Sequence, residues 1–368
     1  MTGTPKFRAD HVGSLLRPPT LLEARTRHEA GEFGDDELRA LEDDAIAAAV
    51  RMQEESGVDV VTDGEFRRRD FRTGFVDAVD GMTMRTWDMP WRGSGGVTKL
   101  RSHTWVVTGR LKQRTRLAAG EAAYVFSRTA MPVKVTLIAP GFLVDRFWKD
   151  GETDKYYGSR NELGAEMAAI TRAEIEALIA EGVSYVQLDN PGYGAFLGAH
   201  GAANPDSRAA FERMLNTDIA AVAGVERPAG VTIGMHVCRG NQSSMWMGEG
   251  DYEPNAEQMF ATLPVDRFLL EYDDDRAGGF DPLRFMPRGR LVVLGLVSSK
   301  TPVPEPAEAL RRRIDQAAKL VDLDDLALSP QCGFASIADG GNLLSPEQES
   351  AKLRLIADVA AATWGAND

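Results

Sequence analysis

The segment MHVCRGN, residues 235–241, places a histidine and a cysteine two positions apart, at His236 and Cys238. They follow an apolar, β-branched run, and on an extended strand residues i and i+2 project to the same face. Both side chains can therefore reach one metal ion. The only other cysteine of the chain is Cys332. In a reducing compartment a chain of this length has little use for one disulfide, so we expect the two thiols to share one site.

Glu271 ends the apolar run FLLE and is the carboxylate best placed to join these residues. Thiolate and imidazole ligands select zinc, so His236, Cys238, Glu271 and Cys332 form a predicted zinc set. A catalytic zinc keeps one position that the substrate can take, and the hard oxygen of Glu271 is the expected labile ligand. A thiol is the substrate that exploits such a metal best, because zinc deprotonates a coordinating thiol. Taken singly, each of these residues could also be a buried core residue.

The elements that must position these residues are β-rich runs that alternate with amphipathic helices. The strand candidates are 7–13, 58–64, 133–139, 184–190, 231–237, 267–273, 290–297 and 324–330, and helical patterns include 35–56, 160–182 and 306–321. Eight such βα units predict an α/β protein with a single (β/α)8 TIM barrel, residues 1–368, as one domain. The stretch of about 72–130 lies outside this order, and we expect it to form an inserted β-excursion beside the barrel mouth.

In a TIM barrel the chemistry lies at the carboxyl ends of the strands. The predicted strand ends are rich in polar residues, and besides the four metal candidates they carry His11, Ser14, Glu65 and Asp189. All eight side chains are therefore expected to face one mouth.

Charge and hydropathy exclude several classes of protein. The chain has 42 Lys and Arg against 55 Asp and Glu, a formal charge of -13 spread along its length, which argues against a nucleic-acid partner. It holds no apolar run near the roughly 18 residues that a membrane span needs, and no secretory signal at its start. We therefore expect a soluble cytoplasmic protein without membrane contact, while its assembly into a homo-oligomer is left open.

Six ordered motifs carry a family resemblance over nearly the whole chain: FRADHVGSLLRP, VTDGEFRR, VQLDNPGYG, MHVCRGN, FLLEYDDD and LSPQCGF. In their order and spacing, these motifs resemble the catalytic barrel of the cobalamin-independent methionine synthase family, and more narrowly its short single-barrel bacterial relatives. The resemblance implies zinc at the same four residues and a thiol substrate, typically homocysteine. It also implies that carboxylates at Glu65 and Asp189 hold the substrate amine and that backbone near Ser14 meets the substrate carboxylate. His11, from its place at the first strand end, is a further candidate at the substrate, as a base or as a group that orients a ligand, and its alternative is a hydrogen-bonded structural role.

Two differences from the full-length synthase bear on the methyl donor. Asn190 stands where that enzyme has a glutamate after strand 4, and Ser298, Ser299 and Lys300 occupy the region where it has a histidine after strand 7. Methyl-folate is therefore predicted to be a poor donor. Single-barrel relatives are thought to use other donors, including methyl-corrinoids.

The predicted function is a zinc-dependent methyl or alkyl transferase in which Glu271, Asp189 and Glu65 act at the reaction centre. The first alternative is a zinc-dependent thiol transferase that opens an epoxide, as in epoxyalkane:coenzyme M transferase, which would not need the amine-binding carboxylates. The second is a non-catalytic zinc-binding barrel, which would have a closed site. A further alternative is the related decarboxylase barrel for porphyrinogens, which has no metal. Such a protein would have no reason to place its only two thiols at strands 5 and 8.

Overall fold

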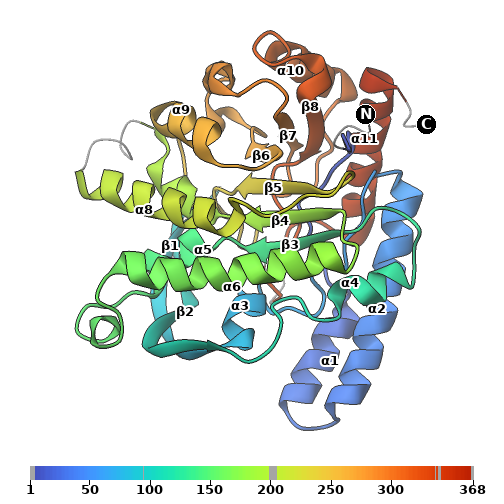
Figure 1. Cartoon of the computed structure of the whole chain (residues 1–368). Helices are drawn as coiled ribbons and strands as arrows, with labels where there is room; N and C mark the ends of the chain where they lie inside the picture. Colours follow the sequence, from blue (N-terminus) through green and yellow to red (C-terminus); the bar gives the residue numbers. More distant parts are fainter. Residues whose placement is uncertain (1–4, 94, 199–204, 336, 339–340, 366–368) are drawn as a thin grey trace.

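The computed structural model describes residues 5–93, 95–198, 205–335, 337–338 and 341–365. Its centre is a six-stranded parallel sheet whose strands follow each other in chain order (Figure 1). The strands are β3 (Lys134–Ile138), β4 (Tyr185–Asp189), β5 (Thr232–Val237), β6 (Arg267–Glu271), β7 (Leu291–Val297) and β8 (Leu326–Pro330). Every residue of these strands is buried, as expected for a parallel sheet covered by its crossover helices. Six of the predicted strands are thus confirmed to within two residues.

The first two predicted strands, 7–13 and 58–64, do not form regular strands. Ala9 makes a single parallel bridge to Leu328 of β8, and Val61 makes one to Val133 beside β3. The Asp59 N–H donates to the Ala9 carbonyl at 2.9 Å, so the two segments also touch each other. Local hydrogen bonds within them, and glycines at positive φ such as Gly13 and Gly64 (φ 133° and 70°), compete with a regular ladder. The structure therefore has an α/β fold with a parallel sheet, and a closed barrel of eight regular strands is not present in the described residues.

Helices pack around the sheet, and α5, α6 and α8 form a layer over β3 to β5 in Figure 1. Local signals fix several helix starts: Ser159 Oγ accepts from the Glu162 N–H before α6, and Ser345 forms a capping box with Gln348 before α11. The predicted helix at 35–56 is confirmed, while those at 160–182 and 306–321 end earlier. The helices are α1 (Pro19–Glu29), α2 (Asp35–Ser56), α3 (Thr73–Ala78), α4 (Glu121–Phe126), α5 (Pro140–Phe147), α6 (Arg160–Ala180), α8 (Pro205–Val222), α9 (Glu253–Thr262), α10 (Ala307–Ala317) and α11 (Pro346–Trp364).

Short 3-10 helices occupy several loops: η1 (Thr153–Lys155), η2 (Pro191–Phe196), η3 (Asp275–Ala277), η4 (Asp281–Phe285) and η5 (Leu323–Asp325). Within the described residues, no helix combines the length and apolar character needed to cross a bilayer.

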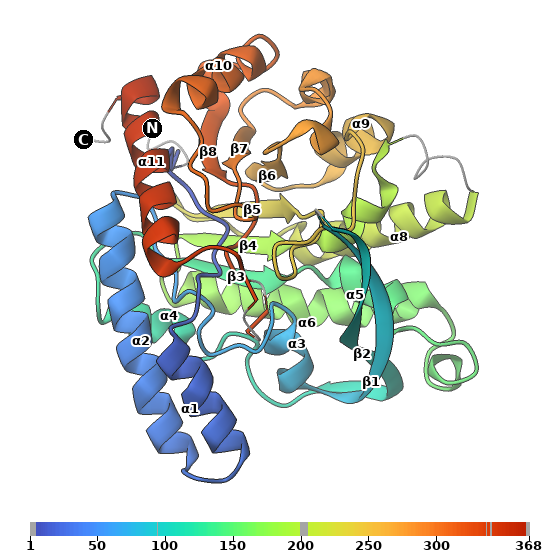
Figure 2. The same ribbon diagram turned by 180° about the vertical axis from the view of Figure 1, so that it is seen from behind.

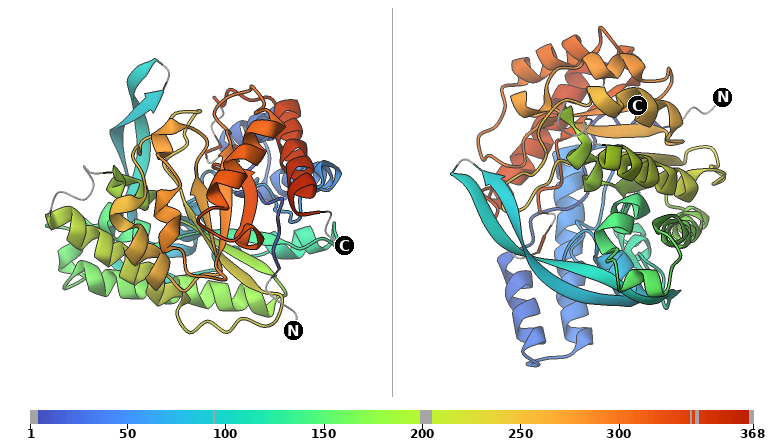
Figure 3. Two further views of the ribbon diagram at one scale, coloured as in Figure 1. Left: turned by 90° about the horizontal axis from the view of Figure 1, so that it is seen from above. Right: turned by 90° about the vertical axis from the view of Figure 1, so that its left-hand side faces the viewer.

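A long antiparallel hairpin forms a separate two-stranded sheet within residues 72–130. It consists of β1 (Val79–Gly93) and β2 (Gly96–Gln113). The hairpin projects from the rest of the chain, as the left view of Figure 3 shows. Near its tip, Arg92 bridges to Trp246, so the hairpin lies beside the loop that follows β5 (Figure 2). The status of this region as an insertion, and the single-domain organisation, stay predictions.

Candidate metal and thiol site

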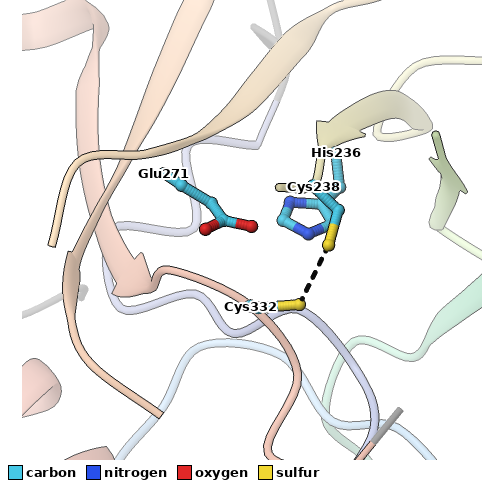
Figure 4. Close-up of side chains that lie close together, drawn as sticks. All are labelled: His236, Cys238, Glu271 and Cys332. Carbon is cyan, nitrogen blue, oxygen red and sulfur yellow. Dashed lines mark hydrogen bonds between the residues drawn. The ribbon is translucent and has the colours of Figure 1, made fainter. Parts of the chain in front are cut away.

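Four side chains that are distant in sequence converge at the carboxyl ends of three strands (Figure 4). His236 lies in β5 and Cys238 just after it, Glu271 is the last residue of β6, and Cys332 follows β8. One ligand atom from each lies within 4.8 Å of all the others, and all four residues are buried. The two Sγ atoms are 3.4 Å apart. The tertiary structure therefore brings together the whole predicted zinc set.

The charges of this cluster favour a thiolate. The hydrogen bond with Cys238, together with the nearby His236 ring, holds the pKa of Cys332 well below its usual value. Burial alone would lower the pKa of His236, but the hydrogen bond and charge of Cys332 outweigh it and raise that pKa. A buried thiolate beside imidazole and carboxylate is the donor chemistry that suits a divalent zinc ion.

Two residues that the sequence did not single out surround the carboxylate of Glu271. The Arg239 backbone N–H donates to Glu271 Oε1 at 2.7 Å. The Lys300 Nζ lies 3.8 Å from Glu271 Oε2, and neither of these two buried atoms has a hydrogen-bond partner among the described residues. This carboxylate oxygen, which has no hydrogen-bond partner in the described residues and belongs to a cluster of Cys, His and Glu, is suited to bind a metal ion. In the sequence, Lys300 was notable only because it lies in the region after strand 7 where the full-length synthase has a histidine.

Glu65 and Asp189, the two predicted amine ligands, line the same cavity as His236, Cys238 and Cys332. Glu65 Oε1 accepts a hydrogen bond from Thr136 Oγ1 at 2.7 Å, while its Oε2 is buried without a partner in the described part of the chain. Burial, reinforced by the charge of Glu65, raises the pKa of Asp189 to about 7, although His236 opposes this shift. Arg68 Nη1 also lies 3.7 Å from Glu65 Oε1. The unpartnered Oε2 of Glu65, close to the Asp189 carboxylate, leaves acceptor capacity that can bind an ammonium group.

Of the other two predicted substrate residues, Ser14 lines this cavity and His11 does not. Ser14 is held against the end of β8 because Gly333 leaves room for it: a Cβ at position 333 would lie 2.0 Å from Ser14 Oγ. His11 is buried, its Nε2 lies 3.0 Å from the Val60 carbonyl oxygen, and burial lowers its pKa to about 4. These contacts are those of a neutral structural histidine, so a role for His11 at the substrate stays an untested prediction.

The cavity has a volume of about 660 Å³, within the range of small-molecule sites. Beyond the cysteines and carboxylates, the hairpin contributes apolar and aromatic walls through Met84, Met89, Trp91 and Trp105. Arg146 from α5 also lines this outer part, and burial together with the charge of Arg72 lowers its pKa to about 10. The guanidinium of Arg146 stacks on aromatic rings and has no carboxylate partner among the described residues. The outer part therefore suits an apolar body with an anionic group.

Comparisons with known proteins agree with this geometry. Residues 7–360 match the model of the cobalamin-independent synthase catalytic domain. The chain is 39% identical to the uncharacterized protein YxjH of Bacillus subtilis, over 97% of this chain and 95% of that protein. It is 26% identical to the methionine synthase of Thermococcus kodakarensis, over 88% and 85% of the two chains.

Solved structures show the same fold. A candidate vitamin-B12-independent methionine synthase from Listeria monocytogenes superposes with a TM-score of 0.76 at 30% identity, covering 99% of this chain and 100% of that one. A B12-independent methionine synthase from Shewanella, in complex with selenomethionine, gives a TM-score of 0.75 at 21% identity and covers 97% of this chain and 98% of that one. The chain therefore belongs to the cobalamin-independent methionine synthase family, a family of methionine synthase-like methyltransferases.

Proposed function

We propose that the protein is a zinc-dependent methyl or alkyl transferase whose acceptor is a homocysteine-like thiol. The observation that carries this proposal is the convergence of His236, Cys238, Glu271 and Cys332 within 4.8 Å. The histidine and both cysteines of this set line a cavity that also presents two carboxylates. A non-catalytic zinc site would have no need of a cavity beside its ligands. The barrel closed by residues 7–13 and 58–64, with 72–130 inserted in it, is part of the same proposal.

The four residues fit zinc by type, burial and mutual distance. When bound, zinc supplies Lewis acidity that keeps an acceptor thiol in its nucleophilic thiolate form at neutral pH. Cys238 and Cys332 provide firm ligands. Glu271 would be the hard ligand that gives up its place to the acceptor thiol, and its Oε1 would keep the hydrogen bond from the Arg239 N–H.

Glu65 and Asp189 orient the substrate by pairing with its ammonium group, and Ser14 lies where the carboxylate of the same amino acid can meet backbone. Fixing the amino acid at three points directs its sulfur toward the cysteine cluster, which is the positioning that group transfer requires. An epoxide-opening thiol transferase has no need of two amine-binding carboxylates, so Glu65 and Asp189 favour the amino-acid thiol.

The outer part of the cavity is the place for the alkyl donor. Its walls of methionine and tryptophan, and the guanidinium of Arg146, which has no carboxylate partner in the part of the chain that the structure describes, suit a donor with an apolar body and an anionic group. A cavity of about 660 Å³ and the cobalamin independence that names the family both favour a small donor over a corrinoid.

Metal analysis combined with product analysis tests the proposal. Wild-type protein should hold one zinc per chain and form an S-alkylated product from L-homocysteine and a suitable donor. The double variant Cys238→Ser, Cys332→Ser should lose zinc and turnover together, because thiolate ligands supply most of the affinity.

Glu271→Gln should retain much of the metal while the rate changes, and Glu174→Gln, which alters a fully buried carboxylate of α6 that does not line the cavity, serves as the matched control. Stoichiometric zinc and full turnover in the double cysteine variant would refute the site and the mechanism.

A further inference from the structure

We propose that Lys300 is the positioning residue that receives the Glu271 carboxylate when an acceptor thiol takes the place of that carboxylate in the metal site. The inference rests on the proposed function and extends it to a residue outside the ligand set. Lys300 would thereby decide how readily the site exchanges an oxygen ligand for a sulfur ligand.

The geometry provides a carboxylate with two alternative partners. The Glu271 carboxylate faces His236 and the two cysteines in Figure 4. Its Oε2 has no hydrogen bond among the described residues, and Lys300 Nζ lies 3.8 Å from this atom. That separation is longer than a hydrogen bond and is closed by a small side-chain rotation. Both side chains are almost completely enclosed, with exposed fractions of 0% for Glu271 and 7% for Lys300. A buried ammonium without any hydrogen bond is costly, so a second state in which it gains one is expected.

The backbone around both residues is held in place, which confines the change to the two side chains. Glu271 Oε1 stays anchored by the Arg239 N–H, so the carboxylate can pivot about this bond. In the loop after β7, Ser298 Oγ donates a hydrogen bond to Asp273 Oδ2 at 2.8 Å, and the Ser298 N–H donates to Glu305 Oε1 at 2.8 Å. These contacts fix the loop after β7 that carries Lys300.

Charge balance explains why a cation belongs here. Two thiolates and one carboxylate around a divalent ion leave one net negative charge, and an incoming thiol that releases its proton to solvent adds another. The Lys300 ammonium lies near the Glu271 carboxylate and is close enough to both cysteines and to Asp273 for their charges to act on it. The Arg239 guanidinium turns away and donates to the Gly250 carbonyl. Buried charge of one sign is expensive, so the displaced carboxylate needs this partner.

The experiment compares zinc-loaded wild type, Lys300→Met and Lys300→Arg, because methionine removes the charge at similar volume and arginine retains it. X-ray absorption at the zinc edge counts oxygen and sulfur neighbours before and after addition of L-homocysteine, and calorimetry gives the thiol Kd. In the wild type, one oxygen neighbour should give way to one sulfur. In Lys300→Met we expect the oxygen to remain and the thiol Kd to rise at least tenfold, with thiol-free zinc content unchanged. Lys300→Arg should recover part of the exchange.

Several outcomes would overturn the inference. Exchange of oxygen for sulfur in Lys300→Met with a wild-type Kd would do so, and so would loss of zinc from this variant without thiol, which would mark Lys300 as a structural residue. A wild-type protein that binds no zinc or no homocysteine would instead overturn the proposed function, and the role of Lys300 with it.

Discussion

At the scale of single residues, Glu65 is the most informative position because its backbone is strained. Its φ of 58° lies in the left-handed region, which costs a non-glycine residue about 1–2 kcal/mol, yet the residue is buried at the end of segment 58–64. This conformation directs the carboxylate into the cavity beside Asp189. Strain that persists at a ligand-lining residue is typical of functional sites.

Replacement of Glu65 by glutamine should therefore affect substrate affinity more than folding. The amide keeps an acceptor for Thr136 Oγ1 but removes the charge that an ammonium group needs. We expect L-homocysteine to bind about 10- to 100-fold more weakly, the loss typical of one charged hydrogen bond. The amine-free analogue 4-mercaptobutanoate should bind both proteins alike, as calorimetry can show. Equal losses for the two thiols would contradict the assignment of Glu65 to the amine.

At the scale of secondary-structure elements, α11 closes the chain over the N-terminal segment through one buried carboxyl group. Glu349 lies in the first turn of this helix, and its Oε1 accepts a hydrogen bond from the Leu16 N–H at 2.9 Å. Helix α11 also packs against α2 and β8. Burial raises the pKa of Glu349 to about 8, although the Leu16 N–H and Arg17 oppose the shift. The docking of α11 is thus linked to the protonation of Glu349.

A folded-state pKa raised from 4.5 to about 8 means that the folded protein holds this proton more tightly than the unfolded chain. The resulting stability is fully present below about pH 4.5 and is lost as the pH rises through about 8. The free energy of unfolding of the wild type should therefore fall, relative to Glu349→Gln, by a few kcal/mol between pH 5 and pH 9. Urea titrations at both pH values measure this difference. Glu347→Gln, at an exposed position of the same helix, retains Glu349 and should follow the wild-type profile over this pH range. Parallel pH profiles for wild type and Glu349→Gln would refute the link.

At the scale of the whole molecule, the metal candidates join parts of the chain that are far apart in sequence. Cys238 and Cys332 are 94 positions apart, since 332 minus 238 is 94, and they follow different strands. Zinc bound by these ligands stabilises the folded state and not the unfolded one, because the unfolded chain does not bring the ligands to one point.

Zinc should consequently raise the thermal stability of the molecule. At a free metal concentration a thousandfold above Kd, linkage predicts a stabilisation of about 4.1 kcal/mol, enough to raise the Tm by several degrees. Calorimetry with and without a chelator should show this difference in the wild type and not in the variant Cys238→Ser, Cys332→Ser. A wild-type Tm that does not change with the chelator would indicate that the cluster does not bind metal that stabilises the fold.

Several features could be predicted from the sequence because they depend on local order. The spacing of His236 and Cys238, the rarity of cysteine, and Glu271 at the end of an apolar run pointed to the cluster that the structure assembles. Hydrophobic periodicity located β3 to β8 and the helix at 35–56, since strand and helix patterns arise from residues that are neighbours along the chain.

Other features were decided only by the tertiary structure. Segments 7–13 and 58–64 have strand-like sequences, yet each forms only single bridges. Local hydrogen bonds, positive φ angles and a contact between the two segments, in which Thr62 Oγ1 donates to the Gly13 carbonyl, take the place of a regular ladder. Lys300 and Arg239 became part of the site because the loops after β7 and β5 meet at the end of β6, a proximity that no sequence spacing encodes. The cavity likewise exists because the hairpin contributes walls beside the strand ends. Burial, charge pairing and close approach are properties of the packed molecule, so residues whose roles depend on them emerge only when distant segments come together.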